Sequence, residues 1–300
     1  MLYAIDASVY VFRAWFSIPD DMCDPDGNPV NALYGFARFL ADFLEEVQPT
    51  YIAVAFDEAL KSSFRNEIYP DYKANRDPAP PELKRQFKLC RQFTRALGVR
   101  ECASPAYEAD DLIGTLVTGA RREGRAATIV SRDKDFAQLI SESDTFWDFA
   151  GRRRLGYSEI PEVFGVWPEQ IADFLALAGD SVDNIPGVPG VGKKTAAALL
   201  NHFGTLPVLY ANLDRVSEVK VRGAAKLGAR LAEHRDAAEL SRQLTAIVCD
   251  APMDFGAAEA VRNPPKLGEF NVLCDEAGFG TALRLQAQRI ADTHPETPPV

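Results

Sequence analysis

The 300-residue sequence is poor in the residues that hold zinc or build a disulfide framework. It has five cysteines and three histidines, and no two of the cysteines form a C-x-x-C pair. A structural zinc site needs such residues at close spacing, and a disulfide-rich fold needs many paired cysteines. The composition therefore excludes both classes and predicts reduced thiols, as expected of a cytoplasmic protein.

Long apolar runs are also absent. No stretch approaches the roughly 20 consecutive apolar residues that a membrane-spanning helix requires. The first residues, MLYAIDASVYVFRAW, have no basic start and no small-residue cleavage site, so they do not resemble a signal peptide. We expect a protein without a membrane partner, whose N-terminus is a strand of the fold.

The sequence has no excess of basic charge. Its 43 acidic residues outnumber 33 basic ones, and the net charge is −10. This balance alone argues against nucleic acid as a partner, because most nucleic-acid-binding proteins present basic patches. The objection weakens if many of the acids are gathered at one place and neutralised by bound cations.

The apolar pattern changes character near residue 157. Before that point, short apolar strands at 2–5, 51–56 and 126–130 alternate with amphipathic helices at 31–47, 82–97 and 109–122. This alternation predicts an α/β domain over residues 1–157, with a mostly parallel central sheet and helices on both faces. Short helices dominate from 158 to 291, and residues 292–300 have the composition of a disordered tail.

Acidic residues follow three predicted strands and accompany two predicted helices. In an open α/β sheet, functional groups gather beyond the carboxyl ends of the strands. Taken singly, each acid could be a turn former or a helix cap. Nine carboxylates in one pocket would repel one another without cations, so the joint pattern predicts two or more Mg²⁺-type ions, which could clamp a phosphodiester. The nine are Asp6, Asp57, Glu108, Asp110, Asp111, Asp133, Asp135, Asp180 and Asp183.

A glycine-rich loop, IPGVPGVG at 185–192, precedes a predicted helix that begins with Lys193, Lys194 and Thr195. Gly187, Gly190 and Gly192 would let the backbone approach a phosphate closely, and a helix N-terminus offers free N–H groups. A tight connection between two helices would explain the glycines equally well. The two lysines favour a helix–hairpin–helix turn that binds a DNA backbone without reading its sequence.

Basic and aromatic residues alternate between 61 and 88, a pattern that suits unpaired bases and their phosphates. A solvated surface with some core aromatics is the alternative. We favour a substrate role for Arg65, Tyr72, Lys73 and Arg76. The complete set is Lys61, Phe64, Arg65, Tyr69, Tyr72, Lys73, Arg76, Lys84, Arg85 and Lys88.

With these segments in view, the sequence resembles the 5′-nuclease domain found at the N-terminus of bacterial family A DNA polymerases and as free-standing exonucleases, which is related to flap endonucleases. The resemblance covers about residues 1–285. It implies a PIN-like core with a helical arch near 61–88, and a structure-selective 5′-3′ exonuclease and flap endonuclease of DNA replication and repair. The matching segments are IDASVYVFRAW, AVAFD, FRNEIYPDYKANR, YEADDLIGTL, SRDKDFAQL and DFLALAGDSVDNIPGVPGVGKKTA.

The resemblance also implies roles for particular residues. Lys73 and Arg76 match basic residues of the arch that contact the scissile phosphate, and Arg13 matches a basic position near the site. The hairpin implies a potassium ion near Ser181. Mg²⁺ or Mn²⁺ ions would bind to Asp6, Glu108, Asp110, Asp111, Asp133, Asp135, Asp180 and Asp183, with Asp57 close by as a ninth acid. Two positions depart from the family: Arg132 stands where glycine is usual, and Val182 where serine is frequent.

Two other functions compete with a DNA nuclease. A non-catalytic binder of DNA structures could use the hairpin and the arch, but it would gain nothing from nine acids facing a polyanion. A related nuclease could act on RNA in the cut strand, as in primer removal, and the residues do not exclude it. The expected partners are DNA with 5′ ends or flaps and a DNA polymerase, with the chain itself a monomer.

Overall fold

The computed structural model describes residues 1–58 and 62–294. Lys61, at the start of the predicted arch, lies outside the described residues, and so do positions 295–300 of the predicted tail. Asp292, with which that tail was expected to begin, is the last residue of a helix. In the part of the chain that is described, no helix combines the length and the apolar character needed to cross a bilayer.

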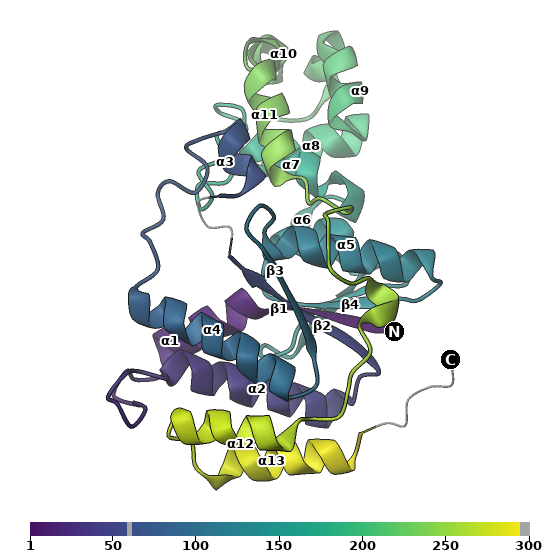
Figure 1. Cartoon of the computed structure of the whole chain (residues 1–300). Helices are drawn as coiled ribbons and strands as arrows, with labels where there is room; N and C mark the ends of the chain where they lie inside the picture. Colours follow the sequence, from purple (N-terminus) through teal and green to yellow (C-terminus); the bar gives the residue numbers. More distant parts are fainter. Residues whose placement is uncertain (59–61, 295–300) are drawn as a thin grey trace.

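A six-stranded sheet forms the centre of the molecule, in the order β3-β2-β1-β4-β5-β6 (Figure 1). β1 to β5 are parallel, and β6 runs antiparallel to β5 at one edge. This confirms the predicted α/β class with a mostly parallel sheet. The strands are β1 (Leu2–Asp6), β2 (Tyr51–Asp57), β3 (Arg100–Ser104), β4 (Ala127–Val130), β5 (Thr145–Asp148) and β6 (Arg153–Gly156).

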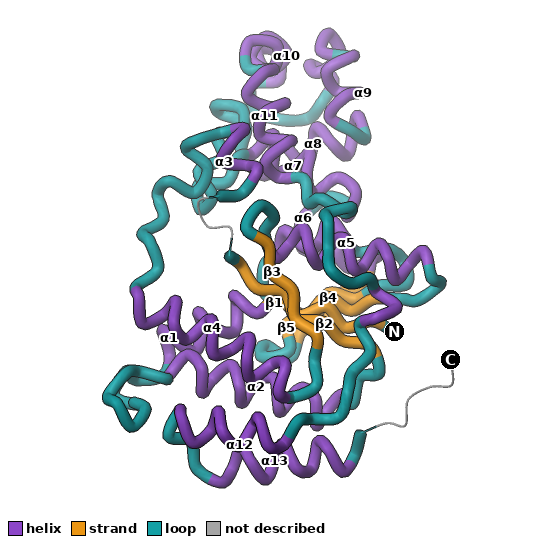
Figure 2. Tube along the Cα trace, in the orientation of Figure 1, coloured by secondary structure: helices purple, strands orange, loops and turns teal. Residues whose placement is uncertain are grey.

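Helices cover both faces of the sheet (Figures 1 and 2). One face carries α1 (Ala7–Ser17), α2 (Asn31–Val47) and α4 (Pro81–Ala96), and α5 (Ala109–Arg122) lies on the other. α2 buries Leu33, Phe36 and Leu40 on one stripe, as its apolar period requires. It crosses α1 so closely that a Cβ at Gly35 would lie 2.4 Å from the Cβ of Ala14.

Between α2 and α4, and after β4, short elements carry the chain past the ends of the strands. These are α3 (Phe64–Ile68), the 3-10 turn η1 (Lys134–Leu139) and η2 (Tyr157–Glu159). The helical region then follows. It consists of α6 (Ile160–Phe164), η3 (Pro168–Gln170), α7 (Ile171–Ala178), α8 (Lys193–Phe203), α9 (Leu206–Ala211), η4 (Leu213–Glu218), α10 (Ala224–Glu233) and α11 (Arg235–Thr245).

After α11 the chain returns to the core. The amide of Ile52 in β2 donates to the carbonyl of Ala260 at 2.7 Å, beyond the short turn η5 (Ala257–Glu259). The last helices, α12 (Leu267–Glu276) and α13 (Thr281–Asp292), lie against α4 and α2 (Figure 1). Gln286 of α13 donates to Asp42 of α2 at 2.7 Å. The helical region is therefore held between two segments that are anchored on the core.

Candidate active site

The parallel strands bring their terminal acids to one edge of the sheet. Asp6 ends β1 and is buried, and its carboxylate accepts hydrogen bonds from the amide of Ser8 at 3.0 Å and from the hydroxyl of Ser131 at 2.8 Å. Asp57 ends β2 and accepts from the Ser8 hydroxyl at 2.6 Å and from the amide of Ala109 at 2.8 Å. The two aspartates therefore join the ends of three strands to the starts of α1 and α5. Sequence reasoning missed both serines, although each stands beside a strand-terminal acid.

The remaining acids converge on the same place. Burial, and then the charges of Asp57 and Asp133, raise the pKa of Asp6 to about 7. Burial, and then repulsion from Asp133, Asp180 and Asp183, raise the pKa of Asp135 to about 8. Asp180 and Asp183 follow α7, so acids of the helical region face those of the sheet. Burial also raises the pKa of Asp110, against the attraction of Arg65. These raised pKa values indicate unfavourable negative charge, which a bound cation would relieve.

Cations of the arch lie inside this cluster. The Nζ of Lys73 is 2.5 Å from Oε2 of Glu108 and 3.8 Å from Oδ2 of Asp183, and Arg76 forms a second ion pair with Asp183. Burial alone would lower the pKa of Lys73, but Glu108, Tyr72 and Asp183 hold it well above its ordinary value. Lys73 also has a left-handed backbone, with φ of 55°, a conformation that concentrates at functional sites when the surrounding structure enforces it.

The donor set suits a hard divalent cation. Only carboxylate oxygens converge here, which is the ligand type of Mg²⁺ or Mn²⁺ rather than of structural zinc. In residues 1–58 and 62–294, no three acidic, cysteine or histidine side chains already lie close enough to hold one metal ion. Glu108 and Asp183 are instead paired with Lys73 and Arg76.

Three residues predicted for the site are buried and bonded within the chain. Arg65, expected to contact DNA, has a side chain that is 1% exposed and is bonded to Asp111. Asp111, expected to bind a metal ion, is fully buried and accepts four hydrogen bonds. Tyr72, expected to contact bases, packs its ring with Ile185 and Leu244 and donates its hydroxyl to Glu108. In this conformation Arg65 and Tyr72 are too deeply buried to contact nucleic acid, and the oxygens of Asp111 are taken up by hydrogen bonds.

The glycine-rich loop is a tight turn that leads into α8. Gly187 has φ of 61°, and a Cβ there would lie 2.3 Å from the backbone nitrogen of Gly179. Gly190 also has a positive φ, of 77°, while Gly192 precedes the first residue of α8. Lys193 and Lys194 are exposed at this helix start, and Thr195 is half-buried. The backbone carbonyl of Ser181, predicted to lie near a potassium ion, accepts from the side-chain amide of Asn75 in the arch at 2.9 Å.

The other singled-out positions have surroundings of their own. Arg13 is exposed and lines a cavity of about 320 Å³ with Tyr10, Arg38 and Arg152. Arg132 pairs with Asp148 at the end of β5, at 3.2 Å, and Val182 is exposed.

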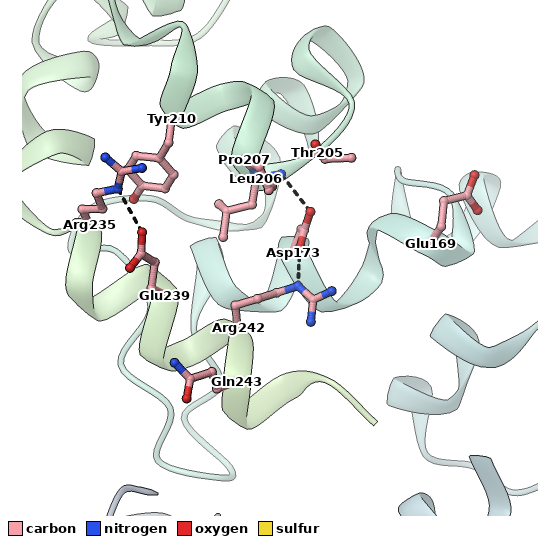
Figure 3. Close-up of a pocket in the computed structure, with 10 residues that line it drawn as sticks. All are labelled: Glu169, Asp173, Thr205, Leu206, Pro207, Tyr210, Arg235, Glu239, Arg242 and Gln243. Carbon is pink, nitrogen blue, oxygen red and sulfur yellow. Dashed lines mark hydrogen bonds and ion pairs between the residues drawn. The ribbon is translucent and has the colours of Figure 1, made fainter. Parts of the chain in front are cut away.

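A larger cavity, of about 640 Å³, lies in the helical region and is shown in Figure 3. There Arg242 points to Asp173, and Arg235 to Glu239. None of the residues predicted for the site lines it.

Two family models together match residues 1–267. Residues 1–165 match "5′-3′ exonuclease, N-terminal resolvase-like domain", and 166–267 match "5′-3′ exonuclease, C-terminal SAM fold". DNA polymerase I of Pseudomonas aeruginosa is 42% identical over 254 residues, which cover 84% of this chain and 28% of that protein. DNA polymerase I of Bacillus subtilis is 35% identical over 314 residues, covering 99% of this chain and 34% of that protein. The chain thus spans about a third or less of the length of these relatives.

Solved structures with the same fold include nucleases with bound metal or DNA. T5 5′-exonuclease with bound divalent metal ions (zinc) has a TM-score of 0.66 and 20% identity, covering 98% of this chain and 99% of that one. The catalytic core of Rad2 with a DNA substrate has a TM-score of 0.61 and 15% identity, covering 96% and 90%. At these identities the similarity establishes the fold, including the helical region that follows the sheet.

Proposed function

This chain belongs to the 5′-3′ exonuclease family, and we propose that it hydrolyses DNA as a structure-selective 5′-3′ exonuclease and 5′-flap endonuclease. The observation that carries the proposal is the convergence of acids from β1, β2, α5, the β4 end and the 180–183 turn on one site, which Lys73 and Arg76 also reach. Acids can face a polyanion productively only when cations lie between them. A protein that merely bound DNA would not need this cluster.

We infer that two or more Mg²⁺ or Mn²⁺ ions bind among the converging carboxylates. When bound, such ions supply a hydroxide at neutral pH and stabilise the attacking and leaving oxygens of a phosphodiester. Asp57 would keep a supporting role as a ninth acid close by, since it accepts hydrogen bonds from Ser8 and Ala109 at the starts of α1 and α5. The proposed ligands are Asp6, Glu108, Asp110, Asp133, Asp135, Asp180 and Asp183.

The cations of the chain would act on the substrate. Lys73 and Arg76, once released from Glu108 and Asp183, would bind the scissile phosphate and stabilise the charge that develops on it. Lys193 and Lys194 would contact the duplex backbone beside the hairpin, where we also propose the potassium ion near Ser181. On this assignment residues 1–157 carry the chemistry, and 158–291 contribute duplex binding.

The similarity to the N-terminal part of DNA polymerase I supports a place in replication and repair. We propose that the protein removes flaps or RNA primers in the cytoplasm, as a monomer, on DNA that a polymerase is also extending. RNA in the cut strand therefore belongs among the substrates to be tested.

The decisive experiment is cleavage of a labelled duplex with a single-stranded 5′ flap, in Mg²⁺ and in chelator. We expect cutting near the flap junction in Mg²⁺ alone, and an Asp133→Asn variant should lose at least about a thousandfold in rate while still binding the DNA. Asp214→Asn, at an exposed acid of η4, is the matched control. Cutting by Asp133→Asn at the wild-type rate would refute the site, and degradation from 3′ ends would refute the polarity. The same assay with an all-RNA flap compares the cleavage rates of RNA and DNA in the cut strand.

A further inference from the structure

Arg65 is the largest of the fully buried side chains, although it belongs to the basic stretch of the arch. Its guanidinium meets the carboxylate of Asp111 through two parallel hydrogen bonds, of 2.7 Å from Nη1 and 2.8 Å from Nη2. Its Nε donates to the carbonyl of Leu244 at 2.9 Å, and Nη2 also donates to Ala246 at 3.0 Å. A fork-shaped cation is thus bonded to α5 and to the segment that leaves α11.

Asp111 has no acceptor capacity left for a metal ion. Besides the two bonds from Arg65, its Oδ1 accepts from the amide of Val248 at 2.8 Å and its Oδ2 from the amide of Glu108 at 3.1 Å. A carboxylate offers about four lone-pair sites, so all are used. The neighbouring Asp110 is freer to bind a metal ion, because its side chain is 27% exposed and lies 3.9 Å from Nη1 of Arg65, beyond hydrogen-bonding distance.

Residues 244–248 connect this pair to the rest of the site. Gln138 of η1, close after Asp135, donates to the carbonyl of Thr245 at 3.0 Å and accepts from the amide of Ile247 at 3.0 Å. α5 approaches the same segment so closely that a Cβ at Gly114 would lie 2.9 Å from the carbonyl oxygen of Val248. The segment is therefore fixed to α3, α5 and η1 together.

The arch is held at two points. Arg65 fixes its base, and residues 71–75 dock on the 181–184 turn: the amide of Lys73 donates to the carbonyl of Asp183 at 3.0 Å, and Asn184 donates to that of Asp71 at 2.7 Å. Lys73 lies within the docked stretch 71–75, and Arg76 directly follows it. A displacement of about 1 Å at a reacting group can cost about a hundredfold in rate.

We propose that Arg65 and Asp111 form a buried latch that positions Lys73 and Arg76 over the acidic site, and that Asp111 is a positioning residue rather than a metal ligand. The inference rests on the proposed nuclease function for its kinetic consequence only. The binding of metal and the position of the arch can both be measured without cleavage.

The test compares Asp111→Asn with Asp110→Asn, the same chemical change at adjacent residues. Titration calorimetry measures Mn²⁺ affinity, and single-turnover assays at saturating DNA measure the rate of flap cleavage. The rate of tryptic cleavage after Lys73 and Arg76 reports the position of the arch. For Asp111→Asn we expect Mn²⁺ affinity equal to or up to about tenfold above that of wild type, because a released arch frees Glu108 from Lys73, together with tenfold to a hundredfold slower cleavage and faster tryptic cleavage. Asp110→Asn should lose Mn²⁺ affinity and keep the arch protected.

Arg65→Lys extends the test, because lysine keeps the charge but cannot make the two parallel bonds. It should behave like Asp111→Asn. If Asp111→Asn does not fold, the double variant Arg65→Met/Asp111→Leu replaces both buried charges with apolar side chains of similar size. It should bind Mn²⁺ at least as tightly as wild type and cleave slowly with an unprotected arch.

Three results would overturn the latch: loss of Mn²⁺ affinity in Asp111→Asn comparable to that of Asp110→Asn, an arch as protected as in wild type, or wild-type cleavage by the folded double variant. If the wild-type chain fails to cleave any flap, the proposed function fails, while the Mn²⁺ and tryptic measurements still decide the latch.

Discussion

Lys73 Nζ lies 2.5 Å from Oε2 of Glu108, so a cation of the arch is bonded to a carboxylate that we assign to metal binding. Burial would raise the pKa of Glu108, but Lys73 and Arg65 hold it below its ordinary value. Lys73 and a divalent ion would therefore compete for the same oxygen. A DNA phosphate that draws Lys73 away should therefore strengthen metal binding. Because linkage is reciprocal, the metal should strengthen DNA binding by the same factor.

The first prediction follows from this competition. Lys73→Ala should bind Mn²⁺ about tenfold more tightly in calorimetry, since the loss of one favourable ion pair of about 1.4 kcal/mol corresponds to that factor. The same variant should cleave a flap about a hundred to a thousand times more slowly, because the developing charge loses its partner. Lys266→Ala, at an exposed position just before α12, is the control. Weaker Mn²⁺ binding by Lys73→Ala would show that the lysine supports the metal site instead.

The second prediction concerns Asp135, whose pKa of about 8 reflects burial and repulsion from neighbouring acids. Asp135 is ionised in the unfolded chain above its ordinary pKa, so raising that pKa in the fold costs stability at neutral pH. Asp135→Asn removes this cost, so in chelator at neutral pH the variant should melt at a higher temperature than wild type. A gain of about 1 kcal/mol corresponds to roughly 2 °C in a chain of this size. In Mg²⁺ the order of the two melting temperatures should reverse, because wild type is stabilised more by the bound ion. Thermal melts under both conditions check this, and an unchanged order would count against metal binding at Asp135.

The third prediction concerns Lys193 and Lys194, both exposed at the start of α8. Replacing both with alanine should weaken binding to any duplex sequence and should reduce the slope of log affinity against log salt by about 2. Binding measured at several salt concentrations, on two unrelated duplexes, gives both quantities. A loss confined to one sequence would indicate base contacts, and an unchanged slope would remove the lysines from the interface.

The fourth prediction separates two glycines of the hairpin. Gly187→Ala should lower the free energy of unfolding by at least about 1–3 kcal/mol, because φ is 61° and the new Cβ would lie 2.3 Å from the Gly179 nitrogen. Gly192→Ala should cost less than about 1 kcal/mol, since its φ is −91° and no atom lies within 4 Å of the added Cβ. Urea unfolding of both variants measures the difference. Equal losses would mean that the turn tolerates a side chain at 187.

The spacing of apolar residues was enough to predict the first and last residues of some helices. α2 and α5 have the bounds expected from their apolar spacing, because each carries a continuous buried stripe. β3 and β6 were not predicted. Their sequences, RECAS and RRLG, carry charges and are only partly buried at the two edges of the sheet, so pairing with a neighbouring strand rather than an apolar pattern defines them.

The gathering of acids at one edge of the sheet was predictable for a related reason. Parallel strands must end at one edge, so the order of elements alone brings Asp6, Asp57 and Asp133 together. The burial of Arg65 could not be read in the same way. Its partners Leu244 and Ala246 are 179 and 181 positions away, and nothing local distinguishes this arginine from the exposed cations of the same stretch.

Because α13 packs on α2, the fold can be completed only late in the synthesis of the chain. Gln286 and Asp42 are separated by 244 positions, so at about 5–20 residues per second their contact must wait roughly 10 to 50 s. Throughout that interval the outer side of α2 lacks its covering helix, and apolar residues of the growing chain stay in contact with water. The N-terminal half therefore cannot reach its final stability on the ribosome before nearly all 292 positions up to the end of α13 have been translated.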